Sequence, residues 1–200
     1  VSLGSLRIRQ DFLIALGLTE EPYAYNQNKD QQILDLALNR IKQLSAHEIG
    51  HTLGFAHNFA ASAKDRASVM DYPHPKLKLI DGKINYEDAY KDGIGDWDKI
   101  SVAYSYSHFP ESIQEDKALQ NILKKSVDQG YKFISDYDAR PIGGAHPSAH
   151  LWDNGDNSVN ELRNILKIRK IALDNFYINH IKENETVSLL EDRLGPVYLL

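Results

Sequence analysis

The feature that most constrains this chain is an eleven-residue stretch from His47 to His57. His47 and His51 are four residues apart, so on a helix both imidazoles lie on one face and can reach a single metal ion. Glu48 points to the neighbouring side, where it can contact a metal-bound water without being a ligand. Gly54 allows the helix to stop in a left-handed turn, after which His57 can return as a third ligand. Three neutral imidazoles and one open position are typical of a catalytic zinc site, whereas four protein ligands close a structural one.

The combined spacing is more specific than the short pattern within it. His-Glu-x-x-His alone is expected by chance in about 2% of chains of this composition, and the added Gly54 and His57 reduce that to roughly 4 in 100,000. The alternative is a buried amphipathic helix whose histidines are satisfied by hydrogen bonds in the core. The full constellation favours the metal site over that alternative.

The extended motif resembles the metzincin clan of zinc peptidases, whose members carry a methionine in a tight turn beneath the metal. The single methionine of this chain, Met70, lies thirteen residues after His57. The resemblance implies that Met70 forms the floor of the metal site without binding the ion. It also implies that Tyr72 is a catalytic residue, acting as a switchable extra ligand and a donor to the transition state. A packed aromatic with a hydrated hydroxyl is an equal alternative for Tyr72.

A closer resemblance extends over most of the chain. Residues 3–7, 47–59, 68–73 and 144–155 are similar to a poorly characterised bacterial family of large, exported metzincin-type proteins. That resemblance implies a periplasmic, cell-surface or secreted location and a polypeptide substrate. It also implies an N-terminal subdomain that carries the edge strand for the substrate backbone. Only 46 residues precede His47, so we expect this chain to be part of a larger protein that supplies the missing subdomain.

Composition excludes several other classes of function. The net charge of −5 provides no basic surface for nucleic acid. The sequence has no apolar run of about 18 residues, so we predict no transmembrane helix. Cysteine is absent, which excludes disulfides, thiolate metal sites and cysteine nucleophiles.

The hydrophobic pattern predicts a mainly α fold, α+β at most. The resemblance implies that the chain is the C-terminal part of a metzincin-like zincin catalytic domain, with a long active-site helix, a Met-turn and extra helices. We expect three segments. Residues 1–29 are the remnant of an upper subdomain, 30–110 the zinc-binding core, and 111–200 a helical subdomain with a long loop at 136–157.

The long helix should run from about Asp30, a plausible N-cap, to Leu53. Its apolar positions recur at three and four residues: Ile33, Leu34, Ala37, Leu38, Ile41 and Leu44. The opposite face, with Asn39, Arg40 and Gln43, is expected to be solvated.

Weaker patterns suggest the other elements. Residues 6–8 alternate like a strand before a short helix, 19–30 and 58–83 are predicted to be irregular, and 131–134 a short strand. Three further helices are expected. The first is capped by Asp96 and buries Trp97, Ile100 and Ala103. The second runs from a Ser112–Glu115 capping box to Gly130, and the third from a Ser158–Glu161 capping box to about Ile181.

Several other side chains are candidates for the site. In the 136–157 loop, His146, His150 and Arg140 could line a substrate groove, although a packed loop is the plainer interpretation. His74 is a conceivable fourth ligand, but an exposed loop histidine is favoured, because catalysis needs an open position.

Acidic side chains offer two further possibilities. Asp96 and Asp98 could accept hydrogen bonds from an imidazole, but acids at the start of a helix are also favoured by its dipole. The loop acids and amides could hold calcium, yet their spacing does not match an EF-hand, so a packed loop is favoured; they are Asp153, Asn154, Asp156 and Asn157.

These patterns predict a zinc-dependent endopeptidase. Zinc bound by His47, His51 and His57 would activate a water, and Glu48 would act as the general base. Two alternatives stay open: a zinc hydrolase that acts on a non-protein amide, and a non-catalytic metal-binding or interaction domain.

Overall fold

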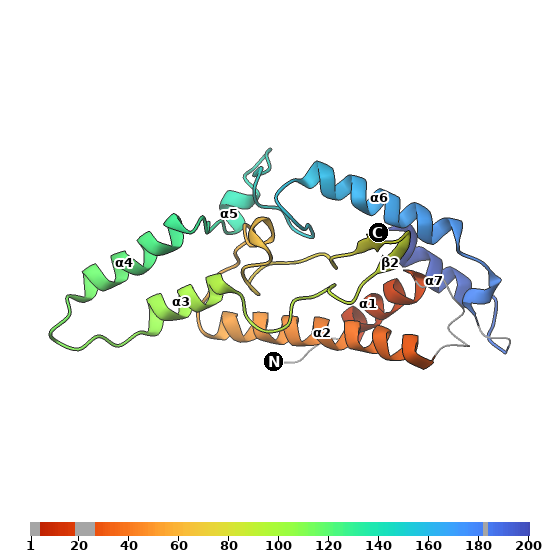
Figure 1. Cartoon of the computed structure of the whole chain (residues 1–200), viewed down its shortest axis with the longest axis horizontal. Helices are drawn as coiled ribbons and strands as arrows, with labels where there is room; N and C mark the ends of the chain where they lie inside the picture. The colour runs from red at the N-terminus through yellow and green to blue at the C-terminus, as the bar shows by residue number, and fades with distance from the viewer. Residues whose placement is uncertain (1–4, 19–26, 182–183) are drawn as a thin grey trace. The chain divides into compact units, whose positions relative to one another are not determined.

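The computed structural model describes residues 5–18, 27–181 and 184–200 and is mostly helical, as predicted (Figure 1). Its α-helices are α1 (Ser5–Leu18), α2 (Gln27–Thr52), α3 (Asp96–Tyr106), α4 (Glu115–Asp128), α5 (Asp136–Ala139), α6 (Ser158–Asp174) and α7 (Leu189–Tyr198). Two 3₁₀ turns, η2 (Ser62–Lys64) and η3 (Ile178–His180), accompany them. A single antiparallel pair, β1 (Lys78–Ile80) and β2 (Lys83–Asn85), is the sheet found in these residues.

The chain divides into two compact units. Unit 1 comprises Val1–Lys42, Pro75–Asp92 and Val159–Leu200, and unit 2 comprises Gln43–His74 and Gly93–Ser158. Helix α2 begins in unit 1 and ends in unit 2, where it carries the histidine motif. These units cross the boundaries near residues 30 and 111 that the sequence suggested, and the division into three functional segments stays a prediction.

Unit 1 is built around an apolar core in which α1 packs against α7. The buried side chains come from α1, α2, α6, α7 and the hairpin region, and include Leu16, Ile33, Leu77, Ile168 and Val197. Burial of these side chains supplies the main stabilising free energy of the unit. Unit 2 has a smaller core of Phe59, Ala60, Ile134, Ala139 and Ala149, against which Tyr72 and Leu151 pack.

The buried face of α2 differs from the one expected. Leu34 and Leu38 are 45% and 42% exposed, whereas Arg40 and Gln43 are only 3% and 6% exposed. The prediction of a solvated Arg40 and Gln43 was therefore wrong. Arg40 places its guanidinium over the ring of Tyr90, 5.2 Å from the centroid, and Gln43 donates from Nε2 to a backbone carbonyl, so both polar groups are satisfied when buried.

The hairpin β1–β2 corrects the expectation of an irregular segment at 58–83. Leu79 pairs with Ile84, and Ile80 pairs with Lys83, across a two-residue loop. Both loop residues have positive φ, 51° at Asp81 and 77° at Gly82. Asp-Gly between alternating apolar residues is the sequence signal for this turn.

Two predicted strands were also wrong. Residues 6–8 belong to helix α1 instead of a strand, because their apolar side chains continue into the helical pattern that follows. Residues 131–134 form no strand. Their backbone is instead satisfied by unit 2, since Ile134 accepts from Phe59 N at 2.9 Å and donates to Asn58 Oδ1 at 3.1 Å.

Helix ends shifted by a few residues from their predictions. Helix α2 begins at Gln27, and residues 19–26 of the expected loop lie outside the described residues. Gly95 is the N-cap of α3 in place of Asp96, Gln114 is the N-cap of α4 in place of Ser112, and α6 ends at Asp174 instead of near Ile181. Gly130 follows α4 with φ +82°, which agrees with its predicted role in ending that helix.

Helix α3 is less buried than its pattern suggested. Trp97, Ile100 and Ala103 are only partly buried. Trp97 and Ile100 line an apolar cavity of about 400 Å³ within unit 2, together with Phe55 and Met70. The apolar side of α3 therefore borders a cavity and does not lie in a closed core.

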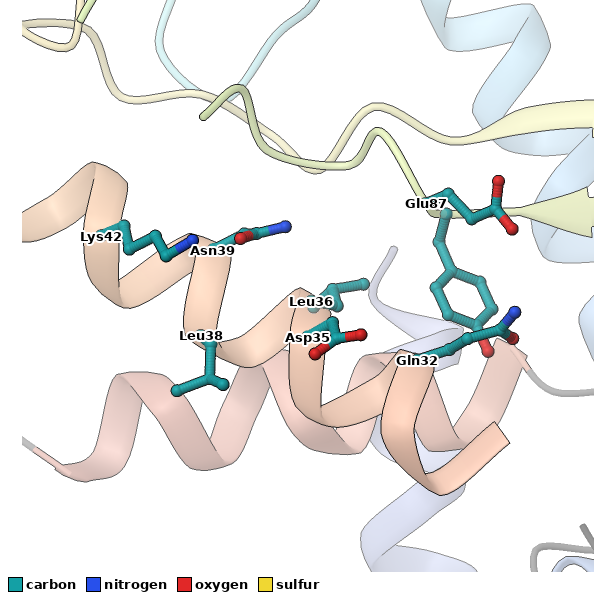
Figure 2. Close-up of a pocket in the computed structure, with 8 residues that line it drawn as sticks. Gln32, Asp35, Leu36, Leu38, Asn39, Lys42 and Glu87 are labelled. Carbon is teal, nitrogen blue, oxygen red and sulfur yellow. The ribbon is translucent and has the colours of Figure 1, made fainter. Parts of the chain in front are cut away.

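Unit 1 carries a polar pocket of about 480 Å³ (Figure 2). Gln32, Asp35, Asn39 and Lys42 line it from α2, and Glu87 comes from the segment after β2. Its lining carries both charge signs and no convergent set of metal-binding groups, so no ligand class follows from it.

Truncation of Ile168 tests the core of unit 1. Ile168 is 0% exposed. Ile168→Ala should lower the free energy of unfolding by about 3 kcal/mol, through lost burial and the cavity left behind. Leu166→Ala is the control, because Leu166 lies on the same helix and is 43% exposed. Equal losses for the two variants in urea denaturation would contradict this assignment of the core.

Candidate metal centre

The end of α2 brings the motif histidines together. The helix ends at Thr52, and Gly54 follows with φ +86°, a conformation that favours glycine. Gly54 N donates to His51 O at 3.0 Å, and Phe55 N donates to Gly50 O at 3.0 Å, so the last turn is closed by backbone hydrogen bonds. The chain turns back after this point and delivers His57.

Three imidazole nitrogens converge in unit 2. His51 Nε2 lies 3.1 Å from His47 Nε2 and 3.1 Å from His57 Nε2, and all three atoms lie within 4.8 Å of one another. Among the described residues, these histidines form the one group of three or more His, Cys, Asp or Glu side chains that could share an ion.

The opposite nitrogen of each ring fixes its tautomer. Nδ1 of His47 lies 2.7 Å from the Val69 carbonyl oxygen, and Nδ1 of His51 lies 2.9 Å from that of Phe55. Nδ1 of His57 lies 2.8 Å from Asp136 Oδ2. Carbonyl and carboxylate oxygens only accept, so each Nδ1 carries the proton and donates. Each neutral ring therefore turns an Nε2 lone pair toward the other two.

This donor set suits a zinc ion. Three lone pairs about 3 Å apart repel one another unless a cation lies between them. A tetrahedral zinc with bonds of about 2.0–2.1 Å holds its nitrogen ligands about 3.3 Å apart, close to the two 3.1 Å separations. Three imidazoles, each fixed by an acceptor on its other nitrogen, are also the usual supported arrangement of a metal-binding histidine.

Burial lowers the pKa of the His47 imidazole from its ordinary value. The Val69 carbonyl and Glu48 oppose this shift, while His51 and His57 add to it. His47 is therefore neutral at neutral pH and has its lone pair available for a metal.

Asp136 is a functional residue that the sequence reasoning missed. It opens the short helix α5 and accepts the hydrogen bond of His57, while Arg140 lies 3.7 Å from its other oxygen. Partial burial would raise the pKa of Asp136, but the hydrogen bond from His57 outweighs it and, together with the charge of Arg140, holds the pKa below its ordinary value. The carboxylate is thus ionised and fixes the third histidine. Its only signal in the sequence was its place at the start of the 136–157 loop.

A turn at Met70 supports the helix from one side. Met70 is 3% exposed, and its sulfur occupies the space beside Gly50, where an added Cβ would lie only 2.2 Å from Sδ. Any larger residue at position 50 would displace the methionine. Met70 thus packs on the helical turn that connects His47 and His51, which is the arrangement expected of a floor residue.

Asp98 accepts hydrogen bonds from the turn at Met70 and not from an imidazole. Its Oδ1 accepts from Ser68 Oγ at 2.5 Å, and its Oδ2 accepts from Val69 N at 2.9 Å and Gly95 N at 2.7 Å. Asp96 is exposed and contacts Lys99 and Tyr131. The suggestion that either acid accepts from a metal-binding histidine was therefore wrong, and Asp136 fills that place.

Tyr72 lies against the histidine cluster. Its ring centroid is 5.2 Å from that of His47, at an interplanar angle of 23°, and 4.7 Å from that of His57. Trp152 stacks on the same tyrosine at 5.4 Å and 13°. Glu48 is half-buried on the helical turn that carries His47. Tyr72 therefore contacts two of the three imidazole rings, and the catalytic roles of Tyr72 and Glu48 stay predictions.

The other candidates occupy different places in unit 2. Arg140 pairs with Asp136, His146 Nδ1 accepts from Ser148 N at 3.0 Å, and His150 is exposed and donates to Leu151 O at 2.9 Å. None of these side chains belongs to the described cluster, nor does that of His74. Their role in a substrate groove stays a prediction.

The two carboxylates among the suggested calcium ligands, Asp153 and Asp156, belong to no group of three or more acidic or histidine side chains in the described residues that could hold an ion. Asn154 donates from Nδ2 to the His74 carbonyl at 3.0 Å, and Asp153 lies beside Asp71. These contacts fit a packed loop.

Asp71 and Asp153 form a buried acidic pair next to the turn. Burial and the charge of Asp153 raise the pKa of Asp71 to about 7, and burial also raises the pKa of Asp153. Backbone donors at Tyr72 and Ser62 offset part of the shift at Asp71. Oδ1 of Asp153 has no hydrogen-bond partner among the described residues.

A comparison with protein families agrees with the histidine site described above. A family model described as Met-zincin matches residues 29–200. The chain belongs to the Met-zincin family. No curated protein and no solved structure matches it. None of the described helices combines the length and apolar character needed to cross a membrane.

Loss of the Asp136 carboxylate should weaken metal binding. Asp136→Ala removes the acceptor that fixes His57, so zinc affinity should fall by about 10-fold or more, as for other residues that orient metal-binding histidines. Asp136→Asn, which keeps an acceptor without the charge, should be intermediate. Competition with a chromophoric chelator measures the affinity, and Asp138→Ala, an exposed acid on the same helix, is the control. Unchanged affinity in Asp136→Ala would contradict the role of this residue.

The acidic pair should make stability depend on pH. In the unfolded chain both carboxyls ionise near pH 4, whereas in the folded chain their pKa values are raised. The contribution of this pair to the free energy of unfolding is therefore fully present below about pH 4, where both carboxyls are protonated, and it is lost as pH rises toward 7. Asp153→Asn should raise the free energy of unfolding by about 1 kcal/mol at pH 8, with a gain that shrinks toward pH 5. Urea denaturation with the exposed Asp156→Asn as control tests this, and a gain independent of pH would contradict it.

Proposed function

We propose that this chain is the zinc-binding catalytic part of an endopeptidase. The observation that carries the proposal is the convergence of three Nε2 atoms whose rings are all fixed by Nδ1 hydrogen bonds, with Glu48 on the same helical turn as His47. Membership of the Met-zincin family supports the same reaction class. His47, His51 and His57 are the residues that would hold the ion.

A zinc ion held by His47, His51 and His57 would supply a Lewis acid for the scissile carbonyl and would lower the pKa of a water molecule toward neutrality. Glu48 then accepts a proton from the attacking water and delivers it to the departing amine nitrogen. The new C–O bond forms first, and the peptide C–N bond then breaks as the nitrogen leaves with the proton from Glu48. The second proton of the water also passes to this nitrogen, so the products are a carboxylate and an ammonium group. Glu48 ends the cycle in its starting protonation state.

Tyr72 and Met70 have supporting parts in this proposal. We propose the Tyr72 phenol as the donor to the negative charge that develops on the carbonyl oxygen, and the contact of its ring with His47 and His57 supports this role. Met70 packs against Gly50 and keeps the two helical histidines in position without binding the ion. Both roles were implied by the resemblance, and the ring and sulfur contacts support them.

The proposed substrate is a polypeptide held with the help of an N-terminal subdomain. His146, His150 and Arg140 are proposed to border its groove, and export from the cell stays a prediction. Two rival functions give different experimental results. A zinc hydrolase of a non-protein amide would cleave such amides and leave peptides intact, and a binding domain would hold zinc without any turnover.

The exchange of Glu48 for glutamine tests the mechanism. Glu48→Gln should retain one equivalent of zinc and lose about 100-fold or more of the peptidase turnover, because a proton acceptor is removed while the ligands are unchanged. Metal analysis together with a peptide-library or casein assay makes the measurement, on this chain and on a longer chain with the N-terminal part. Glu87→Gln is the control, since Glu87 is an exposed acid in unit 1.

The outcomes separate the three functions. Wild-type turnover in Glu48→Gln would show that the mechanism is wrong. One equivalent of zinc with no cleavage by the longer chain would favour the binding domain. Cleavage restricted to non-peptide amides would favour the second hydrolase.

A further inference from the structure

One segment of unit 2 contacts the site without any assigned role. Residues 152–154 lie along the chain that leaves the Met70 turn. Trp152 N donates to the Tyr72 carbonyl at 2.8 Å, and Asn154 Nδ2 donates to the His74 carbonyl at 3.0 Å. The two hydrogen bonds therefore hold the backbone on both sides of Pro73.

The same segment also holds the Tyr72 side chain. The Trp152 indole lies 5.4 Å from the Tyr72 ring at an interplanar angle of 13°, a stacked arrangement. Tyr72 in turn stacks on His47 at 5.2 Å and 23°. Trp152 thus fixes both the carbonyl and the ring of the tyrosine that lies on the histidine cluster.

The backbone of Trp152 is unusual for a residue with a side chain. Its φ is +61°, in the left-handed region, and its side chain is nevertheless 44% exposed. A strained, half-exposed tryptophan is a poor core residue, because it removes only part of its apolar surface from water. The indole of this residue stacks on the Tyr72 ring.

We propose that Trp152 is a positioning residue for Tyr72, whose stacked indole holds the phenol against the histidine cluster. This inference rests on the proposed function for its catalytic meaning, but the positioning itself does not require turnover. Stacking on Trp152 restricts rotation of the Tyr72 side chain, so the phenol spends more time beside the cluster. Trp152 acts through Tyr72 and need not touch the substrate.

A double-mutant cycle tests the catalytic consequence. In the zinc-loaded enzyme, Trp152→Ala should lower kcat about five-fold with little change in KM, since one aromatic contact is lost. Trp152→Phe should restore most of kcat, because a phenyl ring can also stack. In the Tyr72→Phe background, Trp152→Ala should have almost no further effect on kcat, because the phenol is already absent.

The control for these variants is the other tryptophan. The chain contains two tryptophans, and Trp97 stacks on Phe133 at 5.7 Å and 10°, away from Tyr72. Trp97→Phe should leave the coupling to Tyr72 intact. A raised KM in Trp152→Ala, or an equal loss of kcat in the Tyr72→Phe background, would overturn the proposal and would indicate direct substrate contact or a general structural role.

A second measurement does not depend on activity. In protein with ¹³C-labelled tyrosine, the Tyr72 ring resonance is assigned by its loss in Tyr72→Phe. It should be displaced by the ring currents of Trp152 and His47, and zinc should move it further. In Trp152→Ala the displacement and the response to zinc should both fall by at least half, and Trp152→Phe should recover part of each.

The two measurements distinguish failure of the inference from failure of the proposed function. If the longer chain with the N-terminal part is inactive while Tyr72 shows the expected resonance behaviour, the peptidase function is contradicted and the positioning role stays supported. An unchanged Tyr72 resonance and zinc response in Trp152→Ala would overturn the positioning role, whatever the activity.

Discussion

The hydrogen bonds of the Val69 backbone, through its C=O and its N–H, are the constraint on which the rest of the site depends. Its carbonyl accepts from His47 Nδ1 at 2.7 Å and from Gln43 Nε2 at 3.1 Å, and its N–H donates to Asp98 at 2.9 Å. One backbone unit therefore ties α2 to the turn at Met70, and through Asp98 to the start of α3. All of these groups are buried, where an unpaired donor or acceptor costs about 1–3 kcal/mol, so the arrangement has few alternatives.

This constraint favours a metal site over a set of satisfied core histidines. Val69, Phe55 and Asp136 each occupy one Nδ1, and within the described part of the chain Nε2 of His51 lies 3.1 Å from each of the other two Nε2 atoms. Neutral imidazoles in that state present three lone pairs to one point. A divalent cation converts this repulsion into binding energy, and the fixed rings lose little conformational entropy when it binds. Tyr72, held by Trp152, then lies on the same cluster.

The parts of the site that sequence reasoning predicted are local ones. The spacing of His47 and His51 follows from the helical period, and the return of His57 needs only the turn that Gly54 permits, so both can be predicted within eleven residues. The mainly α character also follows from local periodicity. Asp136 and Trp152 could not be found this way. Asp136 lies 79 positions after His57, and Trp152 lies 80 positions after Tyr72. Only the folded backbone brings residues so far apart in sequence into contact. Arg40 and Gln43 were misplaced for a related reason, since their burial depends on partners at Tyr90 and Val69 that no helical pattern contains.

The central claim is that three imidazoles of this chain hold one metal ion. X-ray absorption at the zinc K edge of the zinc-loaded protein measures the ligands directly. Our account predicts one equivalent of zinc with three imidazole nitrogens at about 2.0–2.1 Å and oxygen in the open position. A spectrum fitted by one or two imidazoles, or zinc that distributes over several oxygen-rich sites, would contradict it.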